Sequence, residues 1–275
     1  MGTVIYYYSA TGNSFDVARH LSARLGDVGL KSLVPLASRS VAAEDEVLGI
    51  VFPVYDWSIP FVVRDFLAHL DVSKAKYVFA IATCNFLPGR SLARVDELLR
   101  GKGSRLDAGF VVRMPGTYLP LFEANPPGMV KGKFAAMHRK AARIARIVSS
   151  RRRHRLERSA LLFDWFLAPK FEKAMEHFTE MDREFAVDPV CNSCGVCAKV
   201  CPFGNIEMVG KKPQWLHDCR QCMACLNLCP HDCIQFGQKT QGKRRYKNPA
   251  VSLKELMSLA SESRGSSAPS QSKAL

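Results

Sequence analysis

The chain has 275 residues, of which 47% are hydrophobic, and its formal net charge at pH 7 is +14. This size allows one large core and a second, smaller domain. No stretch approaches the ~20 uninterrupted apolar residues of a membrane span, and the first residues lack the basic and apolar regions of a secretory signal. We therefore expect a cytoplasmic protein.

Residues 1–115 alternate strand and helix signals. Continuous apolar or β-branched runs predict five strands, at 3–8, 31–36, 47–53, 77–83 and 108–115. Helical spacing of the apolar residues predicts intervening helices at 13–25, 60–70 and 91–101. Strands that alternate with helices in this way predict an α/β fold with a doubly wound, five-stranded parallel sheet.

A basic segment follows the expected sheet. Residues 131–158 contain 11 Lys and Arg side chains and a single acidic one, and helices are expected at about 130–150 and 159–182. A solvated helix face is the simplest interpretation. The alternatives are an acidic protein partner, an anionic membrane surface contacted through 131–167, and nucleic acid. Of the partners, we expect a redox protein of acidic character and no nucleic acid.

Nine of the ten cysteines fall between positions 191 and 233, in two copies of the pattern C-x2-C-x2-C-x3-C-P that begin at Cys191 and Cys219. This is the run of bacterial two-cluster ferredoxins, in which the fourth cysteine of each copy ligates the other cluster. The predicted ligand sets are Cys191, Cys194, Cys197 and Cys229 for one [4Fe–4S] cluster and Cys219, Cys222, Cys225 and Cys201 for the second.

Structural zinc is the alternative for these cysteines, but zinc sites use paired C-x2-C knuckles without the closely following third cysteine and Cys-Pro. Two [4Fe–4S] clusters are therefore the favoured interpretation. Cys233 occupies the position that Asn205 holds in the first copy. We expect it to pack as a small side chain rather than to bind iron.

A hydroxyl-rich loop follows the first expected strand and opens the first helix: Ser9, Ala10, Thr11, Gly12, Asn13 and Ser14. Such a loop, with a helix N-terminus behind it, favours an anion. It has neither the Walker A lysine nor the G-x-G-x-x-G spacing, which disfavours a nucleoside triphosphate or a dinucleotide. It resembles the phosphate loop of flavodoxins, which binds FMN, although an ordinary β–α turn could have a similar composition.

Two later loops should lie at the same sheet edge, because the carboxyl ends of parallel strands meet there. Their residues predicted to contact FMN are Pro53, Val54, Tyr55, Trp57, Thr83, Cys84, Asn85 and Gly89. The two aromatic side chains could cover an isoalloxazine ring or simply pack in the loop. Backbone N–H groups of the second loop could meet the pyrimidine side of that ring.

Taken together, these segments resemble prokaryotic fusions of a flavodoxin-like domain to a two-cluster ferredoxin. The matching segments are YYYSATGNS, VFPVYDWSIP, YVFAIATC, DAGFVVRMPGTY, VDPVCNSCGVCAKVCP, DCRQCMACLNLCP and KRRYKNPAVSLKEL. The resemblance implies FMN, two [4Fe–4S] clusters and electron transfer. The expected domains are a flavodoxin-like one at 1–130, a basic helical connector at 131–186, a small α+β ferredoxin-like one at 187–240 and a C-terminal segment at 241–275 that is disordered over 261–275.

The expected function is an electron relay between the clusters and FMN within one chain. A flavin exchanges one or two electrons and a cluster exchanges one, so joining them lets a two-electron step be divided. The alternative is a flavin-dependent reductase of a small molecule that is fed by the clusters. A third possible class is a redox sensor or interaction protein, and the basic segment is the only feature that supports it.

Overall fold

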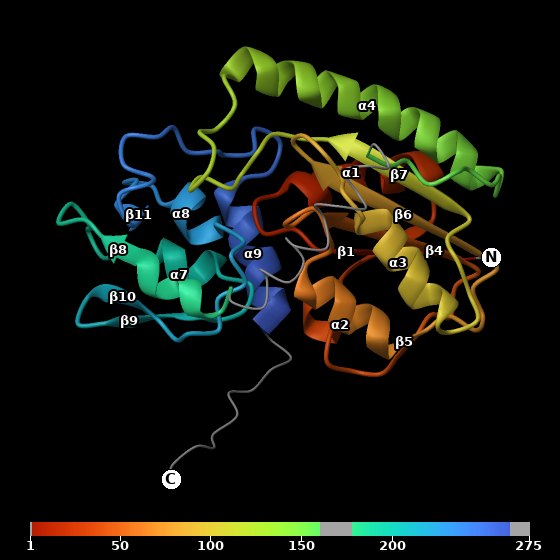
Figure 1. Cartoon of the computed structure of the whole chain (residues 1–275), viewed down its shortest axis with the longest axis horizontal. Coiled ribbons are helices and arrows are strands. Elements are labelled where there is room, and N and C mark those ends of the chain that lie inside the picture. Colours follow the sequence, from red (N-terminus) through yellow and green to blue (C-terminus); the bar gives the residue numbers. More distant parts are fainter. Residues whose placement is uncertain (1, 160–177, 265–275) are drawn as a thin grey trace, which may run out of the picture.

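The structure is a computed structural model, and it describes residues 2–159 and 178–264. Figure 1 shows a large sheet with its helices beside a smaller, cysteine-rich module that contains α7 (Val196–Val200) and α8 (Ala224–Leu228). Helix α9 (Leu253–Arg264) contacts both parts. Within the two described ranges, no helix combines the length and the apolar character needed to cross a bilayer.

Five parallel strands form the sheet in the order β2-β1-β4-β6-β7. They are β1 (Thr3–Tyr7), β2 (Val28–Ser32), β4 (Val47–Pro53), β6 (Tyr77–Cys84) and β7 (Ala108–Arg113). Counted along the chain within this sheet, the order is 2-1-3-4-5, which is the flavodoxin-like arrangement of doubly wound folds. The predicted α/β fold class with a five-stranded parallel sheet is therefore confirmed. Two very short strands, β3 (Val41–Ala42) and β5 (Leu70–Asp71), pair beside it.

The central strands are continuous apolar runs because helices cover both of their faces. All residues of β4 from Val47 to Phe52 are buried. Gly49 pairs with Phe79 of β6, and a Cβ at Gly49 would lie 2.4 Å from Phe79 Cζ. The missing side chain therefore leaves the space that the Phe79 ring fills.

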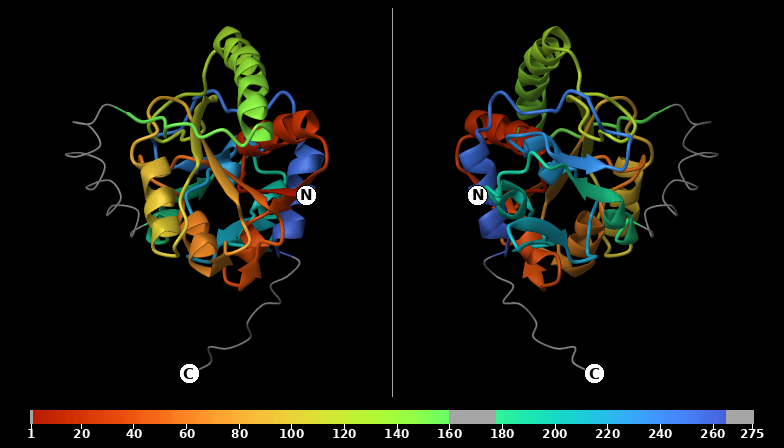
Figure 2. Two further views of the ribbon diagram at one scale, coloured as in Figure 1. Left: turned by 90° about the vertical axis from the view of Figure 1, so that its right-hand side faces the viewer. Right: turned by 90° about the vertical axis from the view of Figure 1, so that its left-hand side faces the viewer.

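Four helices flank the sheet: α1 (Asn13–Leu25), α2 (Phe61–His69), α3 (Ser91–Arg100) and α4 (Pro127–Ser149). Figure 2 shows the sheet nearly end-on between them. α1 and α4 share one apolar cluster with one face, and α2 and α3 share another with the opposite face. The second cluster also contains Val200, Leu228 and Leu256, so the core of the sheet continues into the cysteine-rich module and α9.

The helix expected in the connector packs on the sheet. α4 buries Phe134, Met137 and Ile144 against α1 and β7 and exposes most of its basic side chains, while Lys133 and Lys140 are half-buried. After α4 the chain returns beside β7, where Glu157 N donates to Gly109 O at 3.1 Å. The amphipathic pattern of this segment thus contributes a layer to the α/β part of the molecule.

The strand predicted at 31–36 is partly wrong. β2 lies earlier, and Val34–Leu36 form a short 3-10 helix, η1. Pro35 lies in the first turn of η1, and proline lacks the N–H group that a strand would donate to its neighbour. The backbone pairing of this edge strand with β1 ends at Leu33, whose N donates to Tyr7 O at 2.9 Å.

Two expectations fall partly outside the described residues. The helix expected at 159–182 lies mostly on residues 160–177, which the structure does not describe, and Glu180–Glu184 form a 3-10 helix, η3. Of the segment 261–275, for which the sequence predicts disorder, 261–264 instead form the end of α9. Arg264 Nη1 donates to Ala198 O at 2.7 Å and to Cys201 O at 3.0 Å, which holds this end against the module.

The cysteine-rich module consists of two strand–helix–strand units. The first contains β8 (Phe185–Val187), α7 and β9 (Ile206–Val209), and the second contains β10 (Lys212–Trp215), α8 and β11 (Ile234–Phe236). β8 pairs antiparallel with β11, and β9 with β10. The offset between the starts of α7 and α8, and between those of β9 and β11, equals the offset from Cys191 to Cys219. The repeat seen in the cysteine spacing is therefore also a repeat of secondary structure.

Candidate cofactor sites

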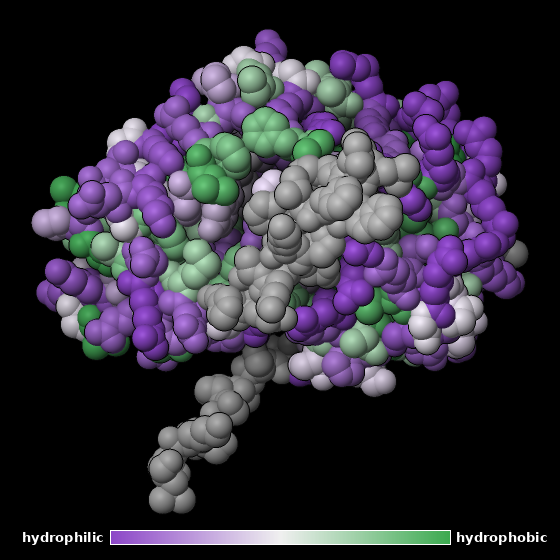
Figure 3. All heavy atoms as spheres, in the orientation of Figure 1, coloured by the Kyte–Doolittle hydropathy of each residue, from purple (hydrophilic) through white to green (hydrophobic). Residues whose placement is uncertain are grey.

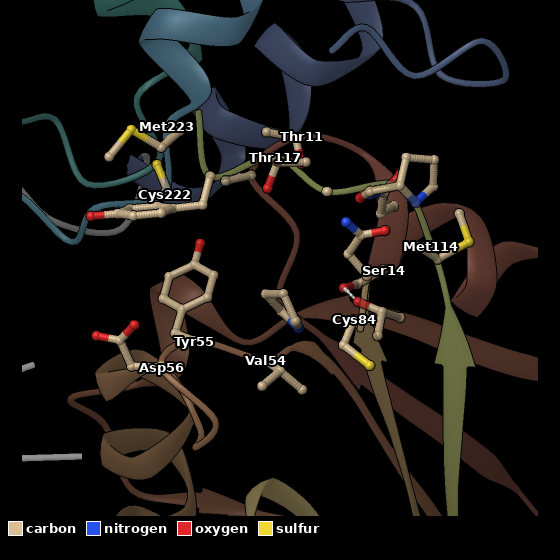
Figure 4. A pocket seen from close by; sticks show the side chains of 18 of the residues that line it. Thr11, Ser14, Val54, Tyr55, Asp56, Cys84, Met114, Thr117, Cys222 and Met223 are labelled. Carbon is tan, nitrogen blue, oxygen red and sulfur yellow. Dashed lines mark hydrogen bonds between the residues drawn. The ribbon is translucent and has the colours of Figure 1, made fainter. Parts of the chain in front are cut away.

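A cavity with an empty volume of about 1150 Å³, open to solvent, lies at the carboxyl edge of the sheet (Figure 4). Loops that follow β1, β4, β6 and β7 line it, where ligands of doubly wound sheets bind. Of the fourteen residues predicted to contact FMN, those that line the cavity are Ser9, Ala10, Thr11, Asn13, Ser14, Pro53, Val54, Tyr55, Trp57, Thr83, Cys84 and Asn85. Gly12 and Gly89 support the loops from outside this lining.

The first loop presents the start of α1 to the cavity. Gly12 is left-handed, with φ 93, and α1 begins at the next residue. The N–H groups in the first turn of a helix have no acceptor within the helix and therefore attract an anion. Thr11 lines the cavity beside them. The buried Asp16 in the same turn would repel an anion, but Arg19 Nη2 lies 2.7 Å from its Oδ1 and offsets that charge.

Asn13 joins this loop to a segment near the other end of the chain. Its Nδ2 donates to Pro115 O at 3.0 Å, and its Oδ1 accepts from Tyr246 OH at 2.6 Å and from Asn248 Nδ2 at 3.2 Å. Both polar atoms of the amide thus have protein partners, so the loop offers its backbone N–H groups rather than this side chain. Sequence reasoning missed Tyr246 and Asn248, because no local pattern reports a contact between opposite ends of the chain.

The second loop turns sharply at Asp56 and Trp57. Tyr55 and Ser58 exchange two backbone hydrogen bonds of 3.2 and 2.8 Å, and between them Asp56 and Trp57 have φ 42 and 57. Two left-handed residues in succession define a type I′ turn, which aspartate tolerates and tryptophan does not favour. A Cβ at Gly89 would lie 2.0 Å from Trp57 O, so only glycine lets the neighbouring loop support this strained turn.

Burial controls the protonation of the polar groups around this turn. Tyr55 OH lies 3.2 Å from Tyr8 OH, and burial raises the pKa of both phenols well above the usual value. Burial also raises the pKa of Asp56 to about 6. The pKa of Tyr118 rises to about 12, first through burial and then through the charge of Asp56. One wall of the cavity therefore holds a carboxyl group that titrates near pH 6 among neutral hydroxyl groups.

The third loop supplies a hydroxyl, a thiol and an amide. Thr83 Oγ1 lies 2.8 Å from Ser14 Oγ, the contact dashed in Figure 4, so these hydroxyls bind each other. Burial raises the pKa of the Cys84 thiol to about 11, which keeps it neutral. Asn85 Oδ1 is buried and has no hydrogen-bond partner within the described part of the chain. A ligand N–H would satisfy it, and the pyrimidine ring of FMN carries one, so the site fits FMN at this point.

The cysteine-rich module closes one side of the cavity. Gln221, Cys222 and Met223 line it, and Figure 4 shows Cys222 and Met223 on the same side as Tyr55, opposite Cys84 and Met114. Gln221 Oε1 is a second buried acceptor that lacks a partner among the residues described. Gln221 and Met223 were not predicted as cavity residues, because their position depends on how the module docks on the sheet.

The two cysteine repeats share an unusual backbone. Left-handed residues occur at three pairs of equivalent positions: Ser193 and Gln221, Gly195 and Met223, and Gly204 and Asp232. Gly195 and Met223 each precede the short helix that carries the third cysteine of its repeat. Because non-glycine residues rarely adopt this conformation, the matching positions indicate that both repeats wrap the same kind of centre.

The cysteines gather in the two sets that the sequence predicts. One small cavity is lined by Cys191, Cys194, Cys197 and Cys229, together with Cys233. In the other set, burial first and then the nearby Cys201 and Cys219 raise the pKa of Cys222, and Cys225 is affected in the same way. Thiols so buried are neutral without a metal, and a metal centre would bind them as thiolates.

The sulfur positions argue against a single metal ion. Four thiolates around one zinc, at about 2.3 Å each, would have sulfurs about 3.8 Å apart. Among all cysteines, each of which is described, no three sulfurs lie within 4.8 Å of one another; the trio that does so in the described chain is Asp16, His20 and His138. Gln221 N also donates to Cys219 Sγ at 3.4 Å, the kind of N–H···S bond that tunes iron–sulfur clusters. A polynuclear cluster therefore fits these sulfurs better than one ion.

The C-terminal end of the basic segment lies at the opposite edge of the sheet from the cavity. Arg151 Nη2 lies 2.8 Å from Glu46 Oε2, and Arg153 Nε lies 3.5 Å from Asp107 Oδ1. Glu46 and Asp107 directly precede β4 and β7, so they mark the amino edge. Figure 3 shows hydrophilic side chains over this end of α4, whereas hydrophobic side chains gather over the loop between β7 and α4.

Strand order and loop positions place the α/β part in the flavodoxin-like class. No family model and no curated protein matches the chain. Solved structures similar to it include an NAD(P)H:quinone oxidoreductase from Methanothermobacter marburgensis (12% identity, 53% of this chain and 98% of that chain, TM-score 0.37) and a flavodoxin from the domain Archaea (14%, 54% and 99%, TM-score 0.35). An FMN-dependent NADH-azoreductase from Bacillus anthracis str. Ames Ancestor, in complex with FMN, matches at 11% identity over 53% of this chain and 100% of that chain, with a TM-score of 0.35.

Proposed function

We propose that the chain transfers electrons between two [4Fe–4S] clusters and an FMN bound at the carboxyl edge of the sheet. The observation that carries the proposal is that Cys222 lines the same cavity as Thr11 and Asn85. A ligand of one cluster would therefore form part of the wall around the flavin. FMN, when bound, supplies a centre that exchanges one or two electrons, and each cluster exchanges one.

Within this proposal the chain's residues have distinct roles. Thr11 and the N–H groups at the start of α1 bind the FMN phosphate. Asn85 Oδ1 and Gln221 Oε1 otherwise lack partners among the described residues. Asn85 Oδ1 would accept the hydrogen bond from the ring N–H, and Gln221 Oε1 would accept one from another donor of FMN, such as a ribityl hydroxyl. Asp56 holds or releases a proton at its carboxyl group near pH 6.

We further propose that a redox protein is the partner and that it approaches the module near Cys194. Cys194 is exposed, whereas Cys222 faces the cavity and Cys225 and Cys229 are buried. An acidic partner bound to the end of the basic segment at Arg151 and Arg153 would instead lie at the amino edge of the sheet. The exposed cysteine is therefore the better entry point for an electron.

Cofactor content after anaerobic purification tests the proposal. We expect about eight iron, eight sulfide and one FMN per chain. Thr11→Val should lower the FMN affinity about 10-fold, because a hydrogen bond to a charged group contributes about 1.5 kcal/mol or more. Thr179→Val, outside the cavity lining, is the control. Stoichiometric zinc, or failure to bind FMN on reconstitution, would refute the proposal.

A second candidate, a flavin-dependent reductase of a small apolar molecule, has one observation in its favour. Exposed apolar side chains surround the cavity mouth: Phe86, Leu87, Leu121 and Phe122. The Phe86 and Phe122 rings lie 5.5 Å apart. For a reductase, anaerobic reoxidation by a planar quinone should saturate, and Phe86→Ser with Phe122→Ser should raise the quinone KM several-fold. For an electron carrier, the rate should stay linear in quinone.

A further inference from the structure

A fifth sulfur lies beside one of the two four-cysteine sets. Cys233 follows Cys229 by four residues, is only 4% exposed, and its Sγ lies 3.4 Å from Cys229 Sγ. It also lines the small cavity that the other four sulfurs of this set surround. The thiol of Cys233 therefore lies next to the candidate metal site and does not simply fill space elsewhere in the module core.

The other set has no such sulfur. The equivalent position in the first repeat is Asn205, four residues after Cys201. Asn205 Nδ2 donates to Asp182 Oδ2 at 3.1 Å, and its Oδ1 accepts from Asp218 N at 2.7 Å. Both polar atoms of the Asn205 amide are hydrogen-bonded, and an amide cannot replace a thiolate. The two repeats therefore differ in that only the second has an additional sulfur, Cys233, near its fourth cysteine.

We propose that Cys233 is an exchangeable ligand that can take the place of Cys229 on the cluster bound by Cys191, Cys194 and Cys197. The inference rests on the proposed function, because it presumes an iron–sulfur cluster in this cavity. In the exchange, the iron–sulfur bond to Cys229 breaks and a bond to Cys233 forms. The proton of the Cys233 thiol passes to Cys229 across the 3.4 Å contact, and no atom changes its oxidation state.

The position of the two residues favours this exchange. Both side chains are buried, so the departing thiol stays in the site instead of reaching solvent. Asp188 N donates to Cys233 O at 2.8 Å, which holds the backbone of Cys233 next to the cavity. Only the side chain must move, and a rotation about a single bond moves a sulfur by a few ångström.

Iron and sulfide content of anaerobically purified variants tests the proposal. We expect Cys229→Ala and Cys233→Ala each to keep about eight iron, and the double variant to fall to about four. Cys201→Ala, whose set has no fifth sulfur, and Cys194→Ala, whose sulfur is not the one that Cys233 contacts, should each fall to about four. Electron paramagnetic resonance of reduced Cys229→Ala should show two cluster signals, one of them shifted by the new ligand geometry.

A Cys229→Ala protein with about four iron would overturn the inference. If Cys229→Ala does not fold, Cys229→Ser is compared with Cys229→Ser/Cys233→Ala, so that any binding by the serine oxygen is common to both. Equal iron in those two proteins would also overturn it. Failure of the proposed function is distinguishable, because the unaltered protein itself would then lack eight iron.

Discussion

The two cysteine repeats have the same backbone but different surroundings. In the first, Cys194 is exposed and the nearby Val190 is 67% exposed. In the second, Gln221 and Met223 are almost fully buried and form a wall of the cavity with Cys222. A nearly symmetric module thus becomes asymmetric through docking on the sheet, because one repeat then meets solvent and the other meets the cavity.

The repeats also differ in strain. At the position before the short helix, the first repeat has Gly195 with φ 70 and the second has Met223 with φ 59. A left-handed residue with a Cβ costs about 1–2 kcal/mol, which glycine avoids. Met223 is 2% exposed, so burial of its side chain offsets this cost. Strain is therefore greater in the repeat that shapes the cavity, where Gln221, Met223 and Asp232 are left-handed, than in the first, where Ser193 is the equivalent non-glycine residue.

The largest effect should come from removing one cysteine of each repeat. Cys194→Ala and Cys222→Ala should each lose about four iron. Only Cys222→Ala should also weaken FMN, about 10-fold or more, because the loop that carries Gln221 and Met223 would lose its anchor at the cavity. Anaerobic fluorescence titration with FMN measures this difference, and equal affinities in the two variants would remove the distinction between the repeats.

A backbone substitution should have a smaller effect. A Cβ at Gly195 would meet nothing closer than Met208 Cγ at 3.9 Å, so Gly195→Ala tests conformation alone. It should lower the free energy of unfolding by about 1–2 kcal/mol, whereas Gly132→Ala, inside α4 near its N-terminal end and in open space, should raise it by about 0.5–1 kcal/mol. Anaerobic thermal unfolding should separate them. Unchanged stability in Gly195→Ala would show that the first repeat is not held in this geometry.

An effect of similar size is expected at Asp56, a titratable residue in the wall of the cavity. Its pKa rises from 3.8 to about 6 on folding. The unfolded chain therefore ionises first, and stability is lost as pH rises from about 4 through 6. The full shift would correspond to about 3 kcal/mol, which partial exposure reduces to about 1–2 kcal/mol.

Asp56→Asn should recover this stability at pH 8 and change little at pH 4, since asparagine also tolerates the left-handed backbone. Thermal unfolding of both proteins at the two pH values is the measurement. An equal gain at both would mean that relief of strain, and not the carboxyl charge, is responsible.

Sequence reasoning succeeded where the physical signal is local. The central strand at 47–53 is a continuous apolar run, and the cysteine spacing is complete within two short segments. It misplaced the edge strand Val28–Ser32, which alternates in burial and has a weaker apolar signal. Met223 and Tyr246 could not be predicted, because Met223 reaches the cavity and Tyr246 reaches Asn13 only after the module and the C-terminal segment have docked.

The hydrogen bond from Tyr246 to Asn13 also has a consequence for biosynthesis. The loop that opens α1 is synthesised long before Tyr246 and Asn248, whose OH and Nδ2 groups hold its amide from 233 and 235 residues further along the chain. Until then, both acceptor positions on Asn13 Oδ1 are open to water, and Gly12 lacks the packing of Val251. The loop that opens α1 therefore gains these contacts only after more than 230 further residues have been made.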